Sequence, residues 1–140
     1  MDREIEFLNA ATAEQRLENL RTLLAEEKEK PVVLPMYANN HIHTTFSFSP
    51  YSPTAAVWAA RRAGLPTAGI MDHDSISGAK EFRQAAKLAG IGSTCGVEMR
   101  ISWKETPFSG RRTNNPDQDG VSYMTFHSIR ERYYARPVSL

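Results

Sequence analysis

The sequence predicts an α/β fold in which parallel strands alternate with helices, preceded by an N-terminal amphipathic helix. From Pro35 onward, strand-like segments alternate with helix-like segments of about 12 residues. The connections between them are short and contain glycine, proline or serine. Such connections favour parallel strands joined by right-handed crossovers. The charge pattern separates residues 1–30, which carry 5 Lys/Arg and 8 Asp/Glu, from the remainder of the chain.

The first expected element is an amphipathic helix over residues 12–29. Residues 12–15 match a capping box, in which the Thr12 side chain caps the helix start. Leucines then recur at the i, i+3 and i+7 positions of one helical face: Leu17, Leu20 and Leu24. Pro31 follows the end of the pattern. We expect this leucine stripe to pack on the following domain, the alternative being that it serves a partner chain.

The remaining elements follow in the order expected for β/α units. Ser52 is a favoured capping residue and Pro53 suits a first helical position, so a helix is predicted to begin there. The predicted strands are 36–44, 67–74, 93–103 and 121–129, and the predicted helices are 53–63 and 78–89. The segment between the last two strands is rich in Pro, Gly, Asn and Asp, and a long loop is expected. We therefore divide the chain into an N-terminal helical segment, residues 1–30, and one α/β domain, residues 36–140.

Composition argues against several classes of protein. A formal net charge of +1 gives no field that would attract nucleic acid or an anionic membrane. No apolar stretch is long enough to span a membrane, and the acidic N-terminus is unlike a signal peptide, so a cytoplasmic location is expected. The single cysteine, Cys95, cannot form an internal disulfide. Because it lies in a strand-like run, we expect a small buried residue rather than a catalytic thiol.

The four histidines all fall near the ends of predicted strands. His41 and His43 are two residues apart in an extended segment, so both imidazoles point to one face and can bind one metal ion. Such a pair alone is weak evidence, because histidines are also common in surfaces and cores. His73 ends the second strand, Glu98 lies on the third, and His127 lies near the end of the fourth. Because the ends of parallel strands form one rim, these residues predict a site suited to zinc, manganese or iron.

The order of these motifs resembles the PHP family, the polymerase and histidinol phosphatase domain. The motifs are His-x-His at the first strand, Asp-His-Asp-Ser at the second and Gly-Val-Glu at the third, and residues 36–127 carry them. The resemblance implies a distorted barrel of seven β/α units with a cluster of two or three metal ions that hydrolyses phosphoesters. It implies as metal ligands and catalytic groups His41, His43, His73 and Glu98, and it matches His127 to the next histidine of the family.

Two departures from the family pattern shape what is expected of this chain. Many members have a carboxylate or histidine five or six residues after the second histidine, where this chain has Phe48 and Ser49. The family also closes its site with an Asp-x-His pair, whereas no histidine or aspartate follows His127. A complete barrel needs roughly 200 residues or more. We therefore expect a truncated domain, the first half of a barrel, that binds metal, shows little or no phosphatase activity alone and self-associates through unpaired sheet edges.

Charged residues near the predicted ligands each have two interpretations. Asp72 and Asp74 flank His73, where a carboxylate can orient an imidazole. The alternatives are that Asp74 caps the following helix and that Asp72 faces the barrel interior. The candidates for contact with a substrate phosphate are Arg100, Arg111 and Arg112. An arginine pair in a polar loop is, however, more often a solvated surface.

The expected function is hydrolysis of phosphate esters by a metal-activated water, with a phosphorylated small molecule or a nucleotide as substrate. One alternative is an incomplete, non-catalytic PHP fragment or interaction module, whose motifs would look the same. A further alternative is an amidohydrolase-type metal-dependent hydrolase, which also begins with His-x-His on its first barrel strand. The Asp-His and Gly-Val-Glu motifs fit that second family poorly.

Overall fold

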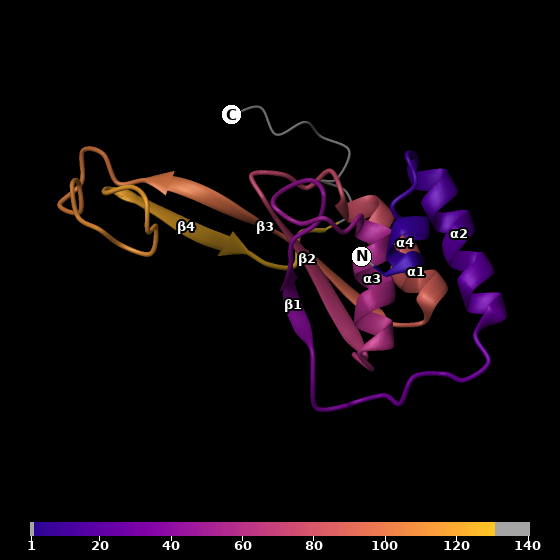
Figure 1. Cartoon of the computed structure of the whole chain (residues 1–140). Coiled ribbons are helices and arrows are strands. Elements are labelled where there is room, and N and C mark those ends of the chain that lie inside the picture. The colour runs from indigo at the N-terminus through magenta and orange to yellow at the C-terminus, as the bar shows by residue number, and fades with distance from the viewer. Residues whose placement is uncertain (1, 131–140) are drawn as a thin grey trace.

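The computed structural model describes residues 2–130, and it confirms the predicted α/β fold (Figure 1). The elements are α1 (Arg3–Leu8), α2 (Ala13–Glu26), β1 (Asn39–Ile42), α3 (Pro53–Arg62), β2 (Thr67–His73), α4 (Ala79–Ala89), β3 (Gly92–Ser102) and β4 (Val121–Phe126). Residues 131–140 of the predicted domain lie outside this range. None of the helices within residues 2–130 is long and apolar enough to cross a membrane.

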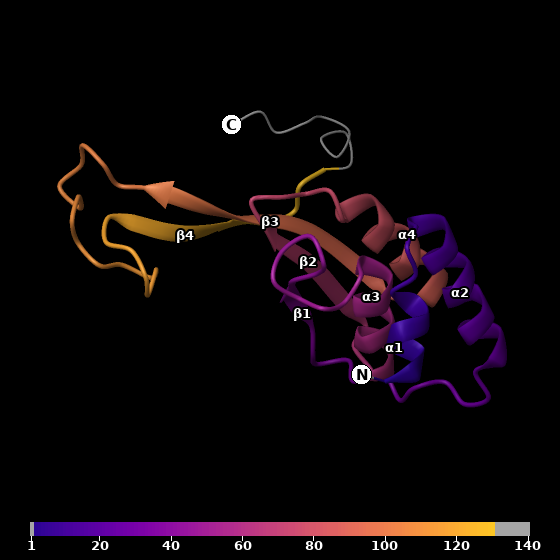
Figure 2. The same ribbon diagram turned by 45° about the horizontal axis from the view of Figure 1, so that its top comes forward.

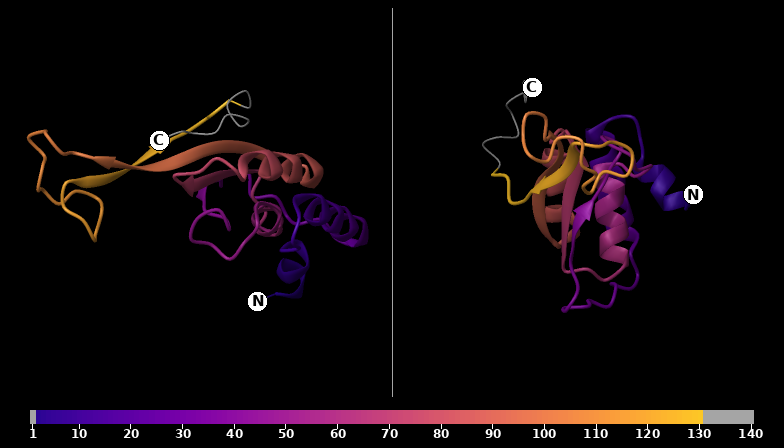
Figure 3. Two further views of the ribbon diagram at one scale, coloured as in Figure 1. Left: turned by 90° about the horizontal axis from the view of Figure 1, so that it is seen from above. Right: turned by 90° about the vertical axis from the view of Figure 1, so that its left-hand side faces the viewer.

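The helices form two layers on one side of the sheet. Helices α3 and α4 lie against β2 and β3, and α1 and α2 pack on the outer side of that pair (Figure 2). The sheet curls as part of a barrel would (Figure 3). Alanines on the packed faces of α3 and α4, such as Ala56 and Ala86, let the helices approach closely around the fully buried Phe82. Cys95 is buried in the same cluster, as its sequence context predicts.

The sheet has the order β1-β2-β3-β4, and its first three strands are parallel as predicted. The expectation that the fourth strand is also parallel is wrong, because β4 runs antiparallel to β3, from Val97 opposite Phe126 to Ser102 opposite Val121. A parallel return would need a crossover connection, usually a helix. The described segment between these strands contains turns and bends but no helix, so the chain reverses and forms a hairpin. This hairpin projects away from the helical layers (Figure 1).

Helix α2 confirms the helix predicted after the capping box, while α1 was not predicted. The Thr12 hydroxyl accepts a hydrogen bond from the Gln15 backbone N–H at 3.2 Å. Leu20 is fully buried, in one hydrophobic cluster with Ile5 and Leu8 of α1. The leucine stripe therefore packs on α3 and α4, as expected. Helix α1 is only six residues long, too short to show a repeating apolar pattern.

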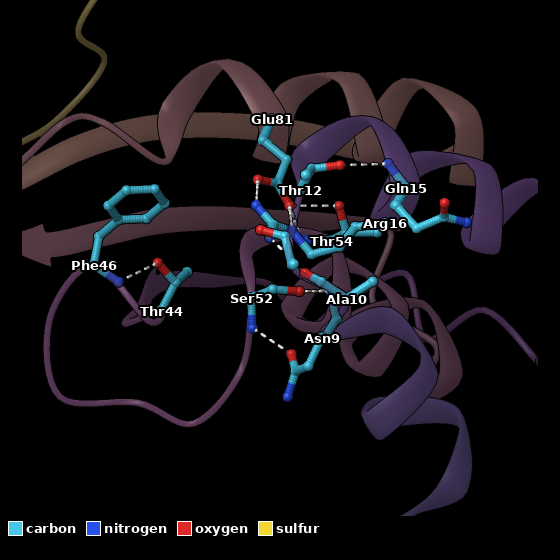
Figure 4. Close-up of polar contacts among 12 residues, drawn as sticks. Asn9, Ala10, Thr12, Gln15, Arg16, Thr44, Phe46, Ser52, Thr54 and Glu81 are labelled. Atoms are coloured by element: carbon cyan, nitrogen blue, oxygen red, sulfur yellow. Dashed lines mark hydrogen bonds and ion pairs between the residues drawn. The ribbon is translucent and has the colours of Figure 1, made fainter.

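Polar contacts join the N-terminal helices to the α/β core (Figure 4). The Ser52 hydroxyl caps α3 by accepting from the Ala55 N–H, and it donates to the Leu8 carbonyl of α1 at 2.6 Å. Arg16 of α2 makes a bidentate ion pair with the buried Glu81 of α4, at 2.6 and 2.8 Å. Hydrogen bonding to Glu81 raises the pKa of Arg16. The two N-terminal helices therefore share one core with the sheet.

The two outer strands of the sheet, β1 and β4, differ in how their edges are covered. On β4, the Asn114 side chain accepts from the Tyr123 N–H and donates to the Tyr123 carbonyl, at 2.9 and 2.8 Å. This amide takes the place of a neighbouring strand at that residue and blunts the edge. Self-association through unpaired sheet edges stays a prediction. We expect it to involve the edge of β1, because Asn114 occupies part of the edge of β4.

Candidate metal centre

The candidate metal centre lies where β1 and β2 end, beside the middle of β3. His41 lies in β1 and His43 directly follows it, while His73 ends β2. The register places His73 beside Glu98 of β3. One ligand atom from each of His41, His43 and Glu98 lies within 4.8 Å of the other two. The geometry thus brings together four of the five residues that strand-end placement selected, and His73 approaches Glu98 without belonging to this mutually close group of three.

Three imidazole nitrogens face a single carboxylate oxygen. Glu98 Oε2 lies 3.3 Å from Nε2 of His41, 3.7 Å from Nε2 of His43 and 3.5 Å from Nε2 of His73. Two ligand atoms that both lie 2.0–2.2 Å from one tetrahedral ion are about 3.4 Å apart. The observed separations match that spacing and exceed those of ordinary hydrogen bonds. The donor set therefore fits a divalent ion with nitrogen and oxygen ligands, such as zinc, manganese or iron.

The imidazole rings pack on one another around the site. The rings of His43 and His73 are stacked, with centroids 4.6 Å apart and an interplanar angle of 8°. Burial lowers the pKa of His43, as do the neighbouring His73 and His41, while Glu98 and Asp72 act in the opposite direction. The neutral form of His43 is therefore favoured, and this is the form that binds a metal.

Asp72 acts on this site through a serine that the sequence reasoning did not select. Asp72 is 1% exposed, and its carboxylate accepts from the Thr44 N–H at 2.6 Å, the Thr44 hydroxyl at 2.7 Å and the Ser47 hydroxyl at 2.9 Å. Ser47 Oγ in turn lies 3.2 Å from His43 Nδ1. Because the Ser47 proton points to Asp72, Oγ accepts from Nδ1–H, which leaves a lone pair on Nε2 of His43. That lone pair faces Glu98, so Asp72 and Ser47 hold His43 in the tautomer a metal needs.

Asp74 positions Arg100 rather than capping a helix. Helix α4 begins after Gly78 with no side-chain cap, so the capping interpretation is wrong. The Asp74 carboxylate instead accepts from the Arg100 N–H and from Nε of the guanidinium, at 3.2 and 2.8 Å. The Asp74 N–H donates to the Glu98 carbonyl at 2.8 Å. Of the three candidate arginines, Arg100 is the one that lines a pocket beside His73.

The other predicted site residues lie elsewhere. His127 is exposed, just after the end of β4, and it is not among the three described imidazoles that approach Glu98 Oε2. Arg111 and Arg112 lie in the loop of the projecting hairpin, where Arg112 pairs with Asp119 at 2.9 Å. This loop begins beyond Ser102, and at about 3.3 Å per strand residue that point is roughly 13 Å along β3 from Glu98.

Comparison with known proteins agrees with this geometry. Residues 39–136 match the PHP domain, and the chain belongs to that family.

Several curated proteins contain segments similar to this chain. It is 39% identical over 64 residues to a 5'-3' exoribonuclease of Haemophilus influenzae, covering 46% of this chain and 23% of that protein. It is 31% identical over 99 residues to an error-prone DNA polymerase of Mycobacterium bovis, covering 69% of this chain and 8% of that protein. It is 36% identical over 68 residues to a DNA polymerase III subunit alpha of Saccharopolyspora erythraea, covering 47% of this chain and 6% of that protein. The chain thus matches less than a quarter of the length of each of these relatives.

Among solved structures, one similar chain comes from Bifidobacterium adolescentis, where it is proposed to be a metal-dependent phosphoesterase. The sequence identity is 29% and the TM-score is 0.47, with 56% of this chain and 26% of that chain covered.

Proposed function

We propose that this chain carries the metal-binding site of a phosphoesterase, which hydrolyses phosphate esters through a metal-activated water. The observation that supports this most strongly is the approach of three imidazole nitrogens to Glu98 Oε2 at 3.3–3.7 Å, at the strand ends of a PHP domain. Membership of the PHP family favours this activity over that of an amidohydrolase.

The residues of the chain have definable roles in such a reaction. His41, His43, His73 and Glu98 would hold the ion. A bound divalent ion lowers the pKa of a water molecule and offsets negative charge on phosphate oxygens. Three of the ligands are neutral and one is an anion, so a site that holds a divalent cation keeps a net positive charge. This charge would attract an anionic phosphate. Ser47 and Asp72 keep the His43 lone pair directed at the ion.

We propose a phosphorylated small molecule or a nucleotide as the substrate. The similarity to a 5'-3' exoribonuclease supports a nucleotide, because such an enzyme hydrolyses phosphodiester bonds between nucleotides. A net charge of +1 gives no support to a long nucleic acid, whose binding depends on many phosphate contacts.

A second candidate function is a metal-binding module without catalysis. It is favoured by the single group of metal-capable side chains found among residues 2–130, because two-metal phosphoesterases need ligands for a second ion. Phe48 and Ser49 occupy the positions where many family members supply a further ligand.

One assay tests the proposal against this alternative. The purified chain is incubated with Mn²⁺ or Zn²⁺ and either p-nitrophenyl phosphate or a nucleoside monophosphate, beside the His41→Ala/His43→Ala variant. We expect slow hydrolysis that requires the metal and disappears in the variant. Equal rates for the wild type and the variant would contradict the proposal, and metal binding without any turnover would support the non-catalytic module.

A further inference from the structure

A pocket of about 320 Å³ lies directly beside the metal centre. Its walls come from three parts of the chain: the loop after β1, the end of β2 and the β3–β4 hairpin. Aromatic rings come from Phe46, Phe48, His73 and Tyr123, and polar groups come from Ser47, Asp74 and Arg100. The candidate metal ligand His73 therefore forms part of the pocket wall, so a molecule in the pocket would lie next to the metal site.

Two aromatic rings flank the His73 ring. The Phe48 ring is 5.2 Å from it at 64°, and the Tyr123 ring is 5.1 Å from it at 60°. Phe48 nevertheless remains 87% exposed, an unusual state for a phenylalanine at the mouth of a pocket. Exposed aromatic faces of this kind stack readily on planar rings of a ligand. Phe48 therefore gives the pocket an exposed stacking surface.

The polar wall limits what the pocket can accept. Asp74 and Arg100 form an ion pair in which Nε and Nη2 of the guanidinium both donate to Oδ2 of the carboxylate, at 2.8 and 2.7 Å. The pair as a whole is neutral, so it offers hydrogen-bonding groups without attracting a second phosphate. An aromatic heterocycle with donors and acceptors on its edge matches both walls. Its faces can stack on the aromatic side chains, and its edge can form hydrogen bonds with the Asp74–Arg100 pair.

We infer that this pocket binds the nucleobase of a nucleoside monophosphate, with Phe48 and Tyr123 as the residues that select a planar group. The inference rests on the proposed function for the placement of the phosphate at the metal centre. It goes beyond that function in assigning a base-binding subsite and the two side chains that select a planar group.

Adenosine tests this subsite independently of metal and of hydrolysis, because it has the base but no phosphate. The metal-free 140-residue chain is titrated with adenosine and, separately, with ribose, and binding is followed by NMR chemical shifts. We expect adenosine to shift the signals of Phe48, His73 and Tyr123, and ribose to leave them unchanged. Phe48→Ala should weaken adenosine binding roughly tenfold, the scale of one lost base-stacking contact.

Tyr37→Ala is the matched control, because Tyr37 is an exposed aromatic residue, 64% accessible, that does not line the pocket. It should bind adenosine as the wild type does. Equal shifts with ribose and adenosine, or unchanged adenosine affinity in Phe48→Ala, would overturn the inference. Because no phosphoester is present, an inactive enzyme with intact adenosine binding would contradict the proposed function alone.

Discussion

Ser47 donates its hydroxyl proton to the buried carboxylate of Asp72 at 2.9 Å, and this one hydrogen bond sets the tautomer of the candidate ligand His43. With its proton committed, Ser47 Oγ can only accept from Nδ1 of His43, 3.2 Å away. The Asp72 carboxylate is held in turn by the backbone and hydroxyl of Thr44. A buried anion thus orients a candidate ligand without contacting it.

Replacing Ser47 with alanine should weaken metal binding without unfolding the chain. Residues that orient a ligand typically contribute 10–100-fold to metal affinity, so we expect a loss of at least about tenfold. A Zn²⁺ titration by calorimetry measures the loss, and circular dichroism checks the fold. Ser49→Ala is the control, because Ser49 lies in the same loop but bonds the Tyr51 N–H instead. Equal affinities for the Ser47 and Ser49 variants would refute the orienting role.

Glu81→Gln should strongly destabilise the fold. Glu81 accepts hydrogen bonds from Arg16 and from the N–H and hydroxyl of Thr54, and its side chain is only 7% exposed. Breaking a buried ion pair leaves the partner charge uncompensated, so we expect unfolding to require about 3 kcal/mol less free energy.

The matched control for that pair is Glu18→Gln, because the Arg21–Glu18 ion pair has side-chain exposures of 53% and 65%. An exposed pair of this kind contributes less than about 1 kcal/mol. Urea unfolding of both variants and of the wild type gives the two differences. Similar losses of unfolding free energy in the two variants would show that the Arg16–Glu81 ion pair does not contribute more than an exposed pair.

Leu20→Ala should also destabilise the chain, which tests whether α2 is an integral part of the fold. Leu20 is fully buried between the N-terminal helices and the core, and removing such a side chain costs about 3 kcal/mol. Val32→Ala, at a residue 82% exposed, should change stability by less than about 0.5 kcal/mol. Thermal melts distinguish the two. An unchanged melting temperature in Leu20→Ala would mean that the helix does not stabilise the domain.

Metal affinity should rise with pH and level off near neutrality. Protons compete with the ion for imidazole nitrogens, so acidification weakens binding. Burial lowers the pKa of His43 below its ordinary value of 6.5, so this residue stays available to the ion at a lower pH than an ordinary histidine. Zn²⁺ titrations between pH 5.5 and pH 7.5 should therefore show affinity falling as the pH falls. An affinity independent of pH over that range would exclude imidazole ligands.

Much of the fold follows from local patterns in the sequence. The capping residues Thr12 and Ser52, and the period of Leu17, Leu20 and Leu24, depend on neighbours within a few positions, and the structure confirms what they predict. The direction of β4 could not be predicted in this way. The direction depends on whether the segment between β3 and β4 forms a crossover helix or turns the chain back on itself. A polar loop sequence is compatible with both outcomes.

The residues of the candidate site also fall into those that local patterns predict and those that depend on distant parts of the chain. Residues at strand ends could be placed together because parallel strands share one rim, which led to His41, His43, His73 and Glu98. Ser47 could not be found, because its role depends on a loop that folds back over Asp72 from 25 positions away. The sequence predicts His127 on the same rim only if its strand is parallel, and the reversal of β4 removes the basis of that prediction.

The central claim is that His41, His43, His73 and Glu98 hold one divalent ion, and a Zn²⁺ titration of the full chain by calorimetry tests it most directly. We predict one ion per chain, with affinity reduced roughly 100-fold or more in His41→Ala/His43→Ala, at or beyond the upper end of what an orienting residue contributes. His127→Ala should bind as tightly as the wild type, because His127 is not among the three described imidazoles that approach Glu98 Oε2. Unchanged affinity in the double variant, or an equal loss in His127→Ala, would contradict the claim.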